Sequence, residues 1–144
     1  MTPEMPRGKR IAMAGMALII LVLVYLFQQF SYAQVIGGLH PNVVFIINKT
    51  VRLILNDLAC MLLIFAVFQR RTYLVVAFYV FLFELLILLP VYFAVKLSLE
   101  GDSEISSPLL SFVHRLIVNP MLMFVLIAGF VYQRFFATAT QKIP

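Results

Sequence analysis

Residues 72–95 read TYLVVAFYVFLFELLILLPVYFAV, and this stretch holds a single charged side chain, Glu84. A helix needs about 20 mostly apolar residues to cross the roughly 30 Å hydrocarbon core of a bilayer. The stretch is longer than that, so it predicts a transmembrane helix. Its one carboxyl group, near the middle of the run, must then be explained.

The composition of the whole chain agrees with a membrane environment. The 144 residues are 63% hydrophobic and 12% charged, and the mean hydropathy is +1.03. A soluble domain is usually about half apolar and about a quarter charged. A folded soluble domain of roughly 150 residues still exposes about a third of the surface of its chain. So much apolar surface could not be hidden from water, and we infer that the solvent is a bilayer.

Three further apolar runs have the length of a membrane span. The first carries no charge and follows the basic sequence RGKR, whereas the other two carry several polar groups. We therefore expect an all-α membrane protein with four transmembrane helices in a single domain, residues 1–144. The expected spans are about 11–30, 50–68, 72–95 and 109–132, with outer loops at 31–49 and 96–108.

Lysine and arginine placement predicts the orientation, because these residues favour the cytoplasmic side. With four spans, both termini and the connection between spans two and three share one side. The opposite side carries Lys49 and Lys96 at its borders and the acidic sequence LEGDSEISS. Both termini are predicted to be cytoplasmic, in the inner membrane of the cell. The basic residues on that side are Arg7, Lys9, Arg10, Arg70, Arg71, Arg134 and Lys142.

Two questions about the N-terminal third stay open. SYAQ at 31–34 has the small–x–small pattern of a signal-peptide cleavage site, but the preceding apolar run is long for a signal peptide. We expect the first span to stay uncleaved. The following segment, 31–49, either lies along the outer membrane surface or dips into the membrane as a re-entrant segment.

The second span opens with several polar residues on one side of the helix. Lys49, Arg52 and Asn56 stand at i, i+3 and i+7 and share a face. Asp57 lies about 100° further round. Lysine and arginine near a helix end can extend to the headgroups, so Lys49 is expected to do so, and for Arg52 this alternative stays open. Asp57 and Glu84 are too short and too deep to reach the headgroups, so they are expected to face protein or a wet cavity.

We predict an intramembrane polar cluster between spans two, three and four. An unpaired ion at the bilayer centre costs at least about 2.5–3.5 kcal/mol, and arginine pairs well with a carboxylate through two parallel hydrogen bonds. Arg52 and Arg115 are therefore expected to face Asp57 and Glu84, although Arg115 could also extend to the headgroups. The members of the predicted cluster are Arg52, Asn56, Asp57, Glu84, His114, Arg115 and Asn119.

The sequence offers no convincing catalytic or metal site. Cys60 lies in the apolar run LACMLLIF near mid-membrane, whereas His114 lies near the outer rim. A nucleophile and its base must come within hydrogen-bond distance, so a thiol peptidase is not expected. His40 and His114 have no spacing that pairs them for a metal. We expect no enzyme activity, no metal, no cofactor and no nucleic-acid binding.

Two stretches resemble a known family. LILNDLACMLLIFAVFQRRTY at 53–73 and LEGDSEISSPLLSFVHRLIVNPMLM at 99–123 are similar to small multi-pass membrane proteins associated with exosortases in Bacteroidota, in particular the exosortase F system-associated type. The resemblance implies a gene beside that of an exosortase, a transpeptidase-like protein-sorting enzyme of the membrane. It supplies no catalytic residues to transfer.

The function we expect is that of a non-enzymatic accessory or partner protein in the membrane. Asp102 and Glu104 would form an outer-loop partner surface. The expected partners are the lipid bilayer and another membrane protein, with an exosortase as a candidate, and a homo-oligomer is left open. The alternative is a small transporter or channel subunit in which Glu84 is the intramembrane proton or substrate site.

Overall fold

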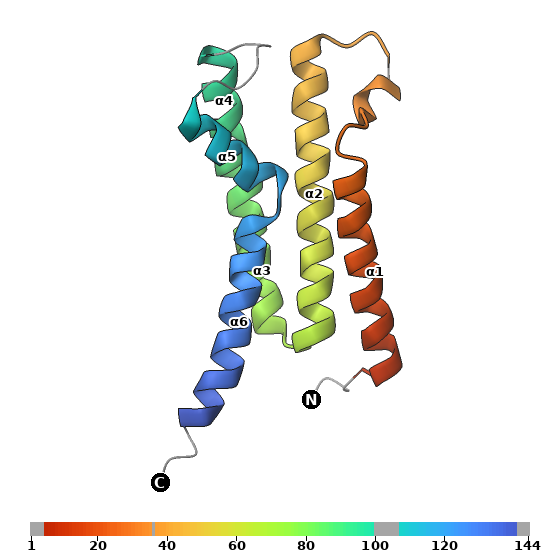
Figure 1. Cartoon of the computed structure of the whole chain (residues 1–144), viewed down its shortest axis with the longest axis vertical. Helices are drawn as coiled ribbons and strands as arrows, with labels where there is room; N and C mark the ends of the chain where they lie inside the picture. The colour runs from red at the N-terminus through yellow and green to blue at the C-terminus, as the bar shows by residue number, and fades with distance from the viewer. Residues whose placement is uncertain (1–4, 36, 100–106, 141–144) are drawn as a thin grey trace.

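Every element of the described chain is helical. The computed structural model describes residues 5–35, 37–99 and 107–140, and its helices run alternately up and down (Figure 1). Three helical stretches are long and apolar enough to cross a membrane, and a bent helix pair would make a fourth span if it crosses as one. The predicted all-α class is confirmed, with three helical stretches able to cross a membrane, or four if the bent pair is one span.

Helix α2, Pro41–Phe68, lies at the centre of the bundle (Figure 1). Helix α1, Arg7–Leu26, packs along it and buries only Ala17 and Val24. Most other side chains of α1 are apolar and exposed, as expected for a helix on the outside of a bundle in lipid. The 3₁₀ turn η1, Tyr32–Val35, connects the two helices.

Helix α2 begins at Pro41, nine residues before the predicted span at 50, so residues 41–49 of the predicted outer segment are the first part of this helix. Pro41 stands in the first turn, where its missing N–H is not needed. His40 caps this turn, since its Nδ1 accepts a hydrogen bond from the Asn42 amide at 3.3 Å. Asn48, already inside the helix, accepts from the Ala33 amide and donates to Ser31 Oγ. The connection before α2 is therefore tied to the helix.

The third span is continuous but contains a π-helical turn. It consists of α3, Arg71–Phe83, the π turn η2, Glu84–Leu88, and α4, Leu89–Leu99. Pro90 lies two residues after the last residue of the π turn. A proline inside an α-helix lacks its N–H and clashes with the carbonyl four residues back. The wider turn, in which the Leu89 amide bonds to the Glu84 carbonyl, accommodates that ring without ending the helix.

The fourth apolar run is broken where one span was expected. Helix α5, Pro108–Val118, and helix α6, Met121–Thr140, meet at 64°. Asn119 between them has extended backbone angles, φ −102° and ψ 138°, which is the conformation that a following proline imposes. Pro120 therefore breaks the predicted helix 109–132 rather than bending it slightly.

Two apolar clusters fill the bundle. The lower cluster, near the end where both termini lie in Figure 1, joins α2, α3 and α6, and the upper cluster joins α2, α4 and α5. The lower cluster contains Cys60, Ile64, Phe68, Ala77, Met123 and Phe130. The upper cluster contains Leu53, Leu89, Tyr92, Leu110 and Ile117. Asp57 and Glu84 come between the two clusters along their own helices.

Candidate functional site

The carboxyl groups of Asp57 and Glu84 form a buried pair, called here the carboxyl pair. Asp57 projects from α2 and Glu84 from the first position of the π turn, and the two side chains share a hydrogen bond. Each residue is only 1% exposed. A hydrogen bond between two carboxyl groups requires a proton on at least one of them. The carboxyl pair therefore holds a proton inside the bundle.

The carboxyl pair lacks further donors. Asp57 Oδ2 and Glu84 Oε1 are buried and accept no hydrogen bond from an amide, hydroxyl or basic group among the described residues. Buried polar atoms are nearly always satisfied in folded proteins, so such atoms need an explanation. Here they are acceptors that a second proton, a water molecule or a small cation could use.

The predicted ion pairs between arginines and acids are wrong. Arg52 is buried, but its Nη2 donates to the backbone carbonyl of Gln28 at the end of α1. Asp57 lies five residues further along α2 and thus about 140° round the helix, so Arg52 turns toward α1 while Asp57 turns toward Glu84. Arg115 is exposed on α5, and no ion pair joins it to the carboxyl pair in the described chain.

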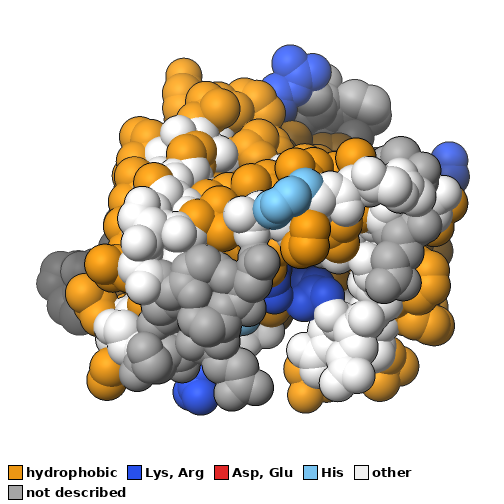
Figure 2. All heavy atoms as spheres, turned by 90° about the horizontal axis from the view of Figure 1, so that it is seen from above, with side chains coloured by type: hydrophobic (Ala, Val, Ile, Leu, Met, Phe, Trp, Pro, Cys, Tyr) orange, Lys and Arg blue, Asp and Glu red, His pale blue; other side chains and the backbone are white. Residues whose placement is uncertain are grey.

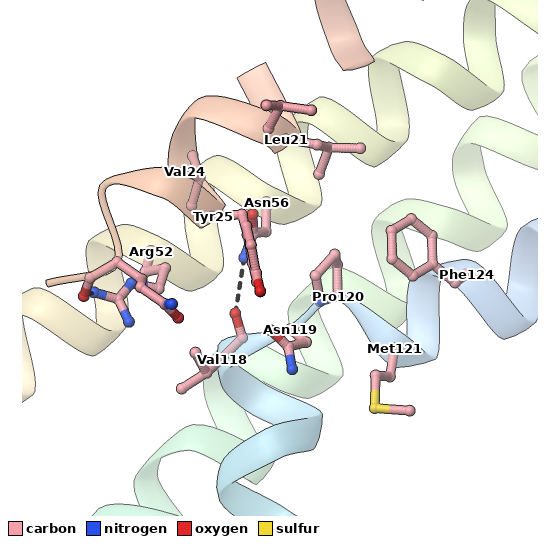
Figure 3. A pocket seen from close by; sticks show the side chains of 12 residues that line it. Leu21, Val24, Tyr25, Arg52, Asn56, Val118, Asn119, Pro120, Met121 and Phe124 are labelled. Atoms are coloured by element: carbon pink, nitrogen blue, oxygen red, sulfur yellow. Dashed lines mark hydrogen bonds between the residues drawn. The ribbon is translucent and has the colours of Figure 1, made fainter. Parts of the chain in front are cut away.

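Asn56 forms a hydrogen bond to the backbone at the break between α5 and α6. Its Nδ2 donates to the Val118 carbonyl at 2.9 Å (Figure 3). Broken helices leave carbonyls without intrahelical partners, and in lipid such groups must be satisfied by protein or by water. Asn119, predicted to join the cluster, is instead exposed at the break. The Asn56 bond thus fastens the broken fourth run onto the central helix.

At the upper end, His114 meets a partner that the sequence did not indicate. The Tyr92 hydroxyl and His114 Nδ1 are 2.6 Å apart, and their rings lie 5.7 Å apart between centroids. This bond joins α4 to α5. His114 therefore belongs to the interface of these two helices rather than to the carboxyl pair.

Basic side chains gather around the same end. The Nζ atoms of Lys49 and Lys96 lie 5.6 Å and 5.1 Å from the centre of the Phe45 ring, a distance at which a ring face attracts a cation. Lys96, expected at the membrane border, is only 4% exposed. Seen from above, Figure 2 shows basic side chains within a hollow between the helices. Among the described residues, no acidic side chain is visible on this face.

At the lower end, arginines cap the last carbonyls of α2. Arg10 donates from Nε to the Ala66 carbonyl at 3.2 Å and from Nη2 to the Val67 carbonyl at 2.9 Å. Arg134 of α6 donates to the same Val67 carbonyl at 3.4 Å. A cation at a helix C-terminus satisfies unpaired carbonyls and matches the helix dipole. These contacts join α1 and α6 to the end of the central helix.

A cavity of about 490 Å³ opens between α1, α2 and the α5–α6 break, and we call it the lateral groove. Its walls are mainly apolar (Figure 3). Its polar lining comes from the segment after α1, from α2 and from the break. Among its lining residues are Val22, Tyr25, Arg52, Asn56, Pro120 and Phe124. Three of the predicted cluster residues, Arg52, Asn56 and Asn119, border this groove, whereas neither residue of the carboxyl pair lines it.

Asp102 and Glu104, the expected outer-loop partner surface, lie outside the described residues. Cys60 is fully buried in the lower apolar cluster, away from the His114–Tyr92 contact of the upper cluster. Within the described ranges, no three His, Cys, Asp or Glu side chains come close enough together to hold a metal ion.

The fold and the placement of charge define the class of protein. Helices of membrane-crossing length present large apolar side chains outward, while Arg52, Asp57, Glu84 and Lys96 are buried. That inverted distribution is typical of a multi-pass membrane protein. Comparisons with protein-family models, with curated proteins and with solved structures gave no match to this chain.

Proposed function

We propose that the protein is a non-enzymatic accessory subunit that binds another membrane protein, in an inner membrane that it crosses four times with both termini in the cytoplasm. The alternating helix directions support this topology, since α5 and α6 return the chain to the end where α1 begins (Figure 1). Basic residues near that end favour the cytoplasmic side. Those in the described chain are Arg7, Lys9, Arg10, Arg70, Arg71 and Arg134.

The observation that carries the partner proposal is the outer face of α5. This helix buries Leu110 and Ile117 against the bundle, while Phe112 and Arg115 are exposed. At 11 residues α5 is about 16 Å long, too short to cross a bilayer alone. A short amphipathic helix that turns an aromatic ring and a guanidinium outward beside a helix break suits a contact with a second protein, because lipid tails offer no acceptor for the guanidinium.

The resemblance to exosortase-associated proteins makes an exosortase the candidate partner. The stretch HRLIVNP at 114–120, which lies within the second of the two resembling sequences, covers the second half of α5 and the break. The proposed contact surface and the proposed family thus point to the same segment.

Site-specific crosslinking in the native membrane tests the proposal. A photoreactive amino acid at Phe112 is expected to capture one discrete membrane protein, while the same group at Val125, an exposed position on α6, captures lipid only. Arg115→Gln should reduce the adduct at position 112. Equal behaviour of the two positions, with no protein adduct at either, would remove the support for a partner at α5.

A second candidate function, a small transporter or channel subunit, rests on the carboxyl pair. A proton held by two buried acids at a π turn resembles an arrangement that can bind and release a proton. Both side chains are 1% exposed, so this function requires the bundle to open. Glu84→Gln is then expected to abolish pH-dependent ion or substrate flux in proteoliposomes. The partner function instead predicts that the Phe112 adduct persists in this variant and that no flux is seen in the wild type.

A further inference from the structure

We propose that the lateral groove binds one anionic phospholipid, with its phosphate at Arg52 and an acyl chain between α1 and α6. The groove is apolar on both walls, which come from Val22 and Tyr25 of α1 and from Phe124 of α6. Its volume of about 490 Å³ falls in the range of pockets that hold small ligands, roughly 300–1,000 Å³. An apolar chain is the ligand that such walls accommodate in a membrane.

Arg52 supplies the charge that selects an anion. Its side chain is 6% exposed, and its one hydrogen bond in the described chain goes to a neutral carbonyl, that of Gln28. The Nε atom has no partner. A guanidinium carries five N–H donors in a planar fork that fits a phosphate. A buried cation whose charge is not matched by a carboxylate therefore favours an anionic ligand from outside the chain.

The depth of Arg52 suits a lipid phosphate. Helix α2 has 28 residues, more than the roughly 20 that cross the hydrocarbon core. If Phe68 marks the lower border of the core, as the following Arg70 and Arg71 indicate, about 20 residues back reaches Lys49. Arg52 then lies about 4.5 Å below the upper border, within reach of a headgroup. Lys49, one turn above on the same face, adds positive charge there.

Native mass spectrometry of the full chain tests the lipid. The probes are phosphatidylglycerol and phosphatidylcholine with identical acyl chains, added to detergent-solubilised protein. The wild type is expected to retain phosphatidylglycerol with a roughly fivefold preference, the scale of one basic residue at an anionic surface. Arg52→Gln should abolish that preference, whereas Arg115→Gln, which changes an exposed arginine outside the groove, should keep it.

A second pair of variants tests whether the groove binds the acyl chain of the lipid, and this test does not depend on Arg52. Val22→Trp narrows the groove from its α1 wall and should remove most of the adduct of either lipid. Leu18→Trp, also exposed on α1 but outside the groove, is the matched control and should bind as the wild type does.

Any one of three results would overturn the proposal. The wild type could retain the two lipids equally, Arg52→Gln and Arg115→Gln could change the lipid preference equally, or Val22→Trp and Leu18→Trp could reduce lipid retention equally. Inorganic phosphate at millimolar concentration should not displace the lipid. If phosphate displaces it and Val22→Trp has no effect, the groove binds a free anion and the lipid assignment is wrong. If Arg52→Gln does not fold, the tryptophan pair and the wild-type preference still decide.

Discussion

The Asp57 carboxyl group is hydrogen-bonded to that of Glu84, and neither forms an ion pair within the described chain. The contact joins the central helix to the π turn of the third span. Since a proton between two acids replaces the expected arginine, the neutral carboxyl group acts here as the donor. With a proton shared between them, the two buried carboxyl groups together carry at most one negative charge.

An amide and an apolar replacement of Glu84 should therefore have different effects on the free energy of unfolding. Glu84→Gln keeps a donor for Asp57 and should change the free energy of unfolding by less than about 1 kcal/mol. Glu84→Leu leaves the Asp57 carboxyl group buried alone and should lower it by about 1–3 kcal/mol. Equilibrium unfolding in mixed detergent micelles measures both. Replacing Asp57 and Glu84 together by leucine should recover part of the loss, and a double variant as unstable as the sum of the single ones would contradict the pairing.

Asn56 should be needed for the broken fourth run. Asn56→Asp has nearly the same shape but no N–H, and it places a carboxylate beside the Val118 carbonyl. We expect it to lower the free energy of unfolding by at least about 1–3 kcal/mol, measured in the same unfolding assay. Thr50→Val is the control, because the Thr50 hydroxyl bonds only to the Ile46 carbonyl of its own helix. A smaller effect of Asn56→Asp than of Thr50→Val would show that the Val118 contact is unimportant.

Arg10 should stabilise the lower end of the bundle, whereas its neighbour Lys9 should not. Arg10 donates to two carbonyls of α2, and Lys9 is exposed. Arg10→Gln is expected to lower the thermal midpoint, with a loss of about 1 kcal/mol. Lys9→Gln removes the same charge and should leave the midpoint unchanged. Equal shifts in the two variants would assign the effect to charge alone.

Cys60 should be chemically inert in the folded protein. It is fully buried in the lower apolar cluster, and a thiol in such a setting does not meet reagents. N-ethylmaleimide should label it only after unfolding in sodium dodecyl sulfate, as followed by intact mass. In a Cys60→Ser background, a cysteine introduced at Leu58, which is 49% exposed, should react in mild detergent. Rapid labelling of Cys60 in the folded wild type would contradict the packing described for α2.

Local features of the sequence predicted much of the fold. The apolar run around Glu84 is long enough to span a bilayer whatever its neighbours are, and the composition excludes a soluble core. Asp57 and Glu84 were expected to face protein because their side chains are too short to reach the headgroups, and both are buried. The span predicted at 109–132 was expected to be continuous, but the 64° angle between α5 and α6 depends on what receives the freed groups, here Asn56 of another helix.

The sequence by itself determined the helical class and which polar groups had to turn away from lipid, since both follow from chain length, hydropathy and side-chain reach. Only the tertiary structure decided the partners: Glu84 for Asp57, the Gln28 carbonyl for Arg52, Tyr92 for His114. The physical reason is that helix periodicity gives the angle between two residues of one helix. The rotation of one helix against the next, and the carbonyls left vacant at turns and breaks, arise only when the helices pack.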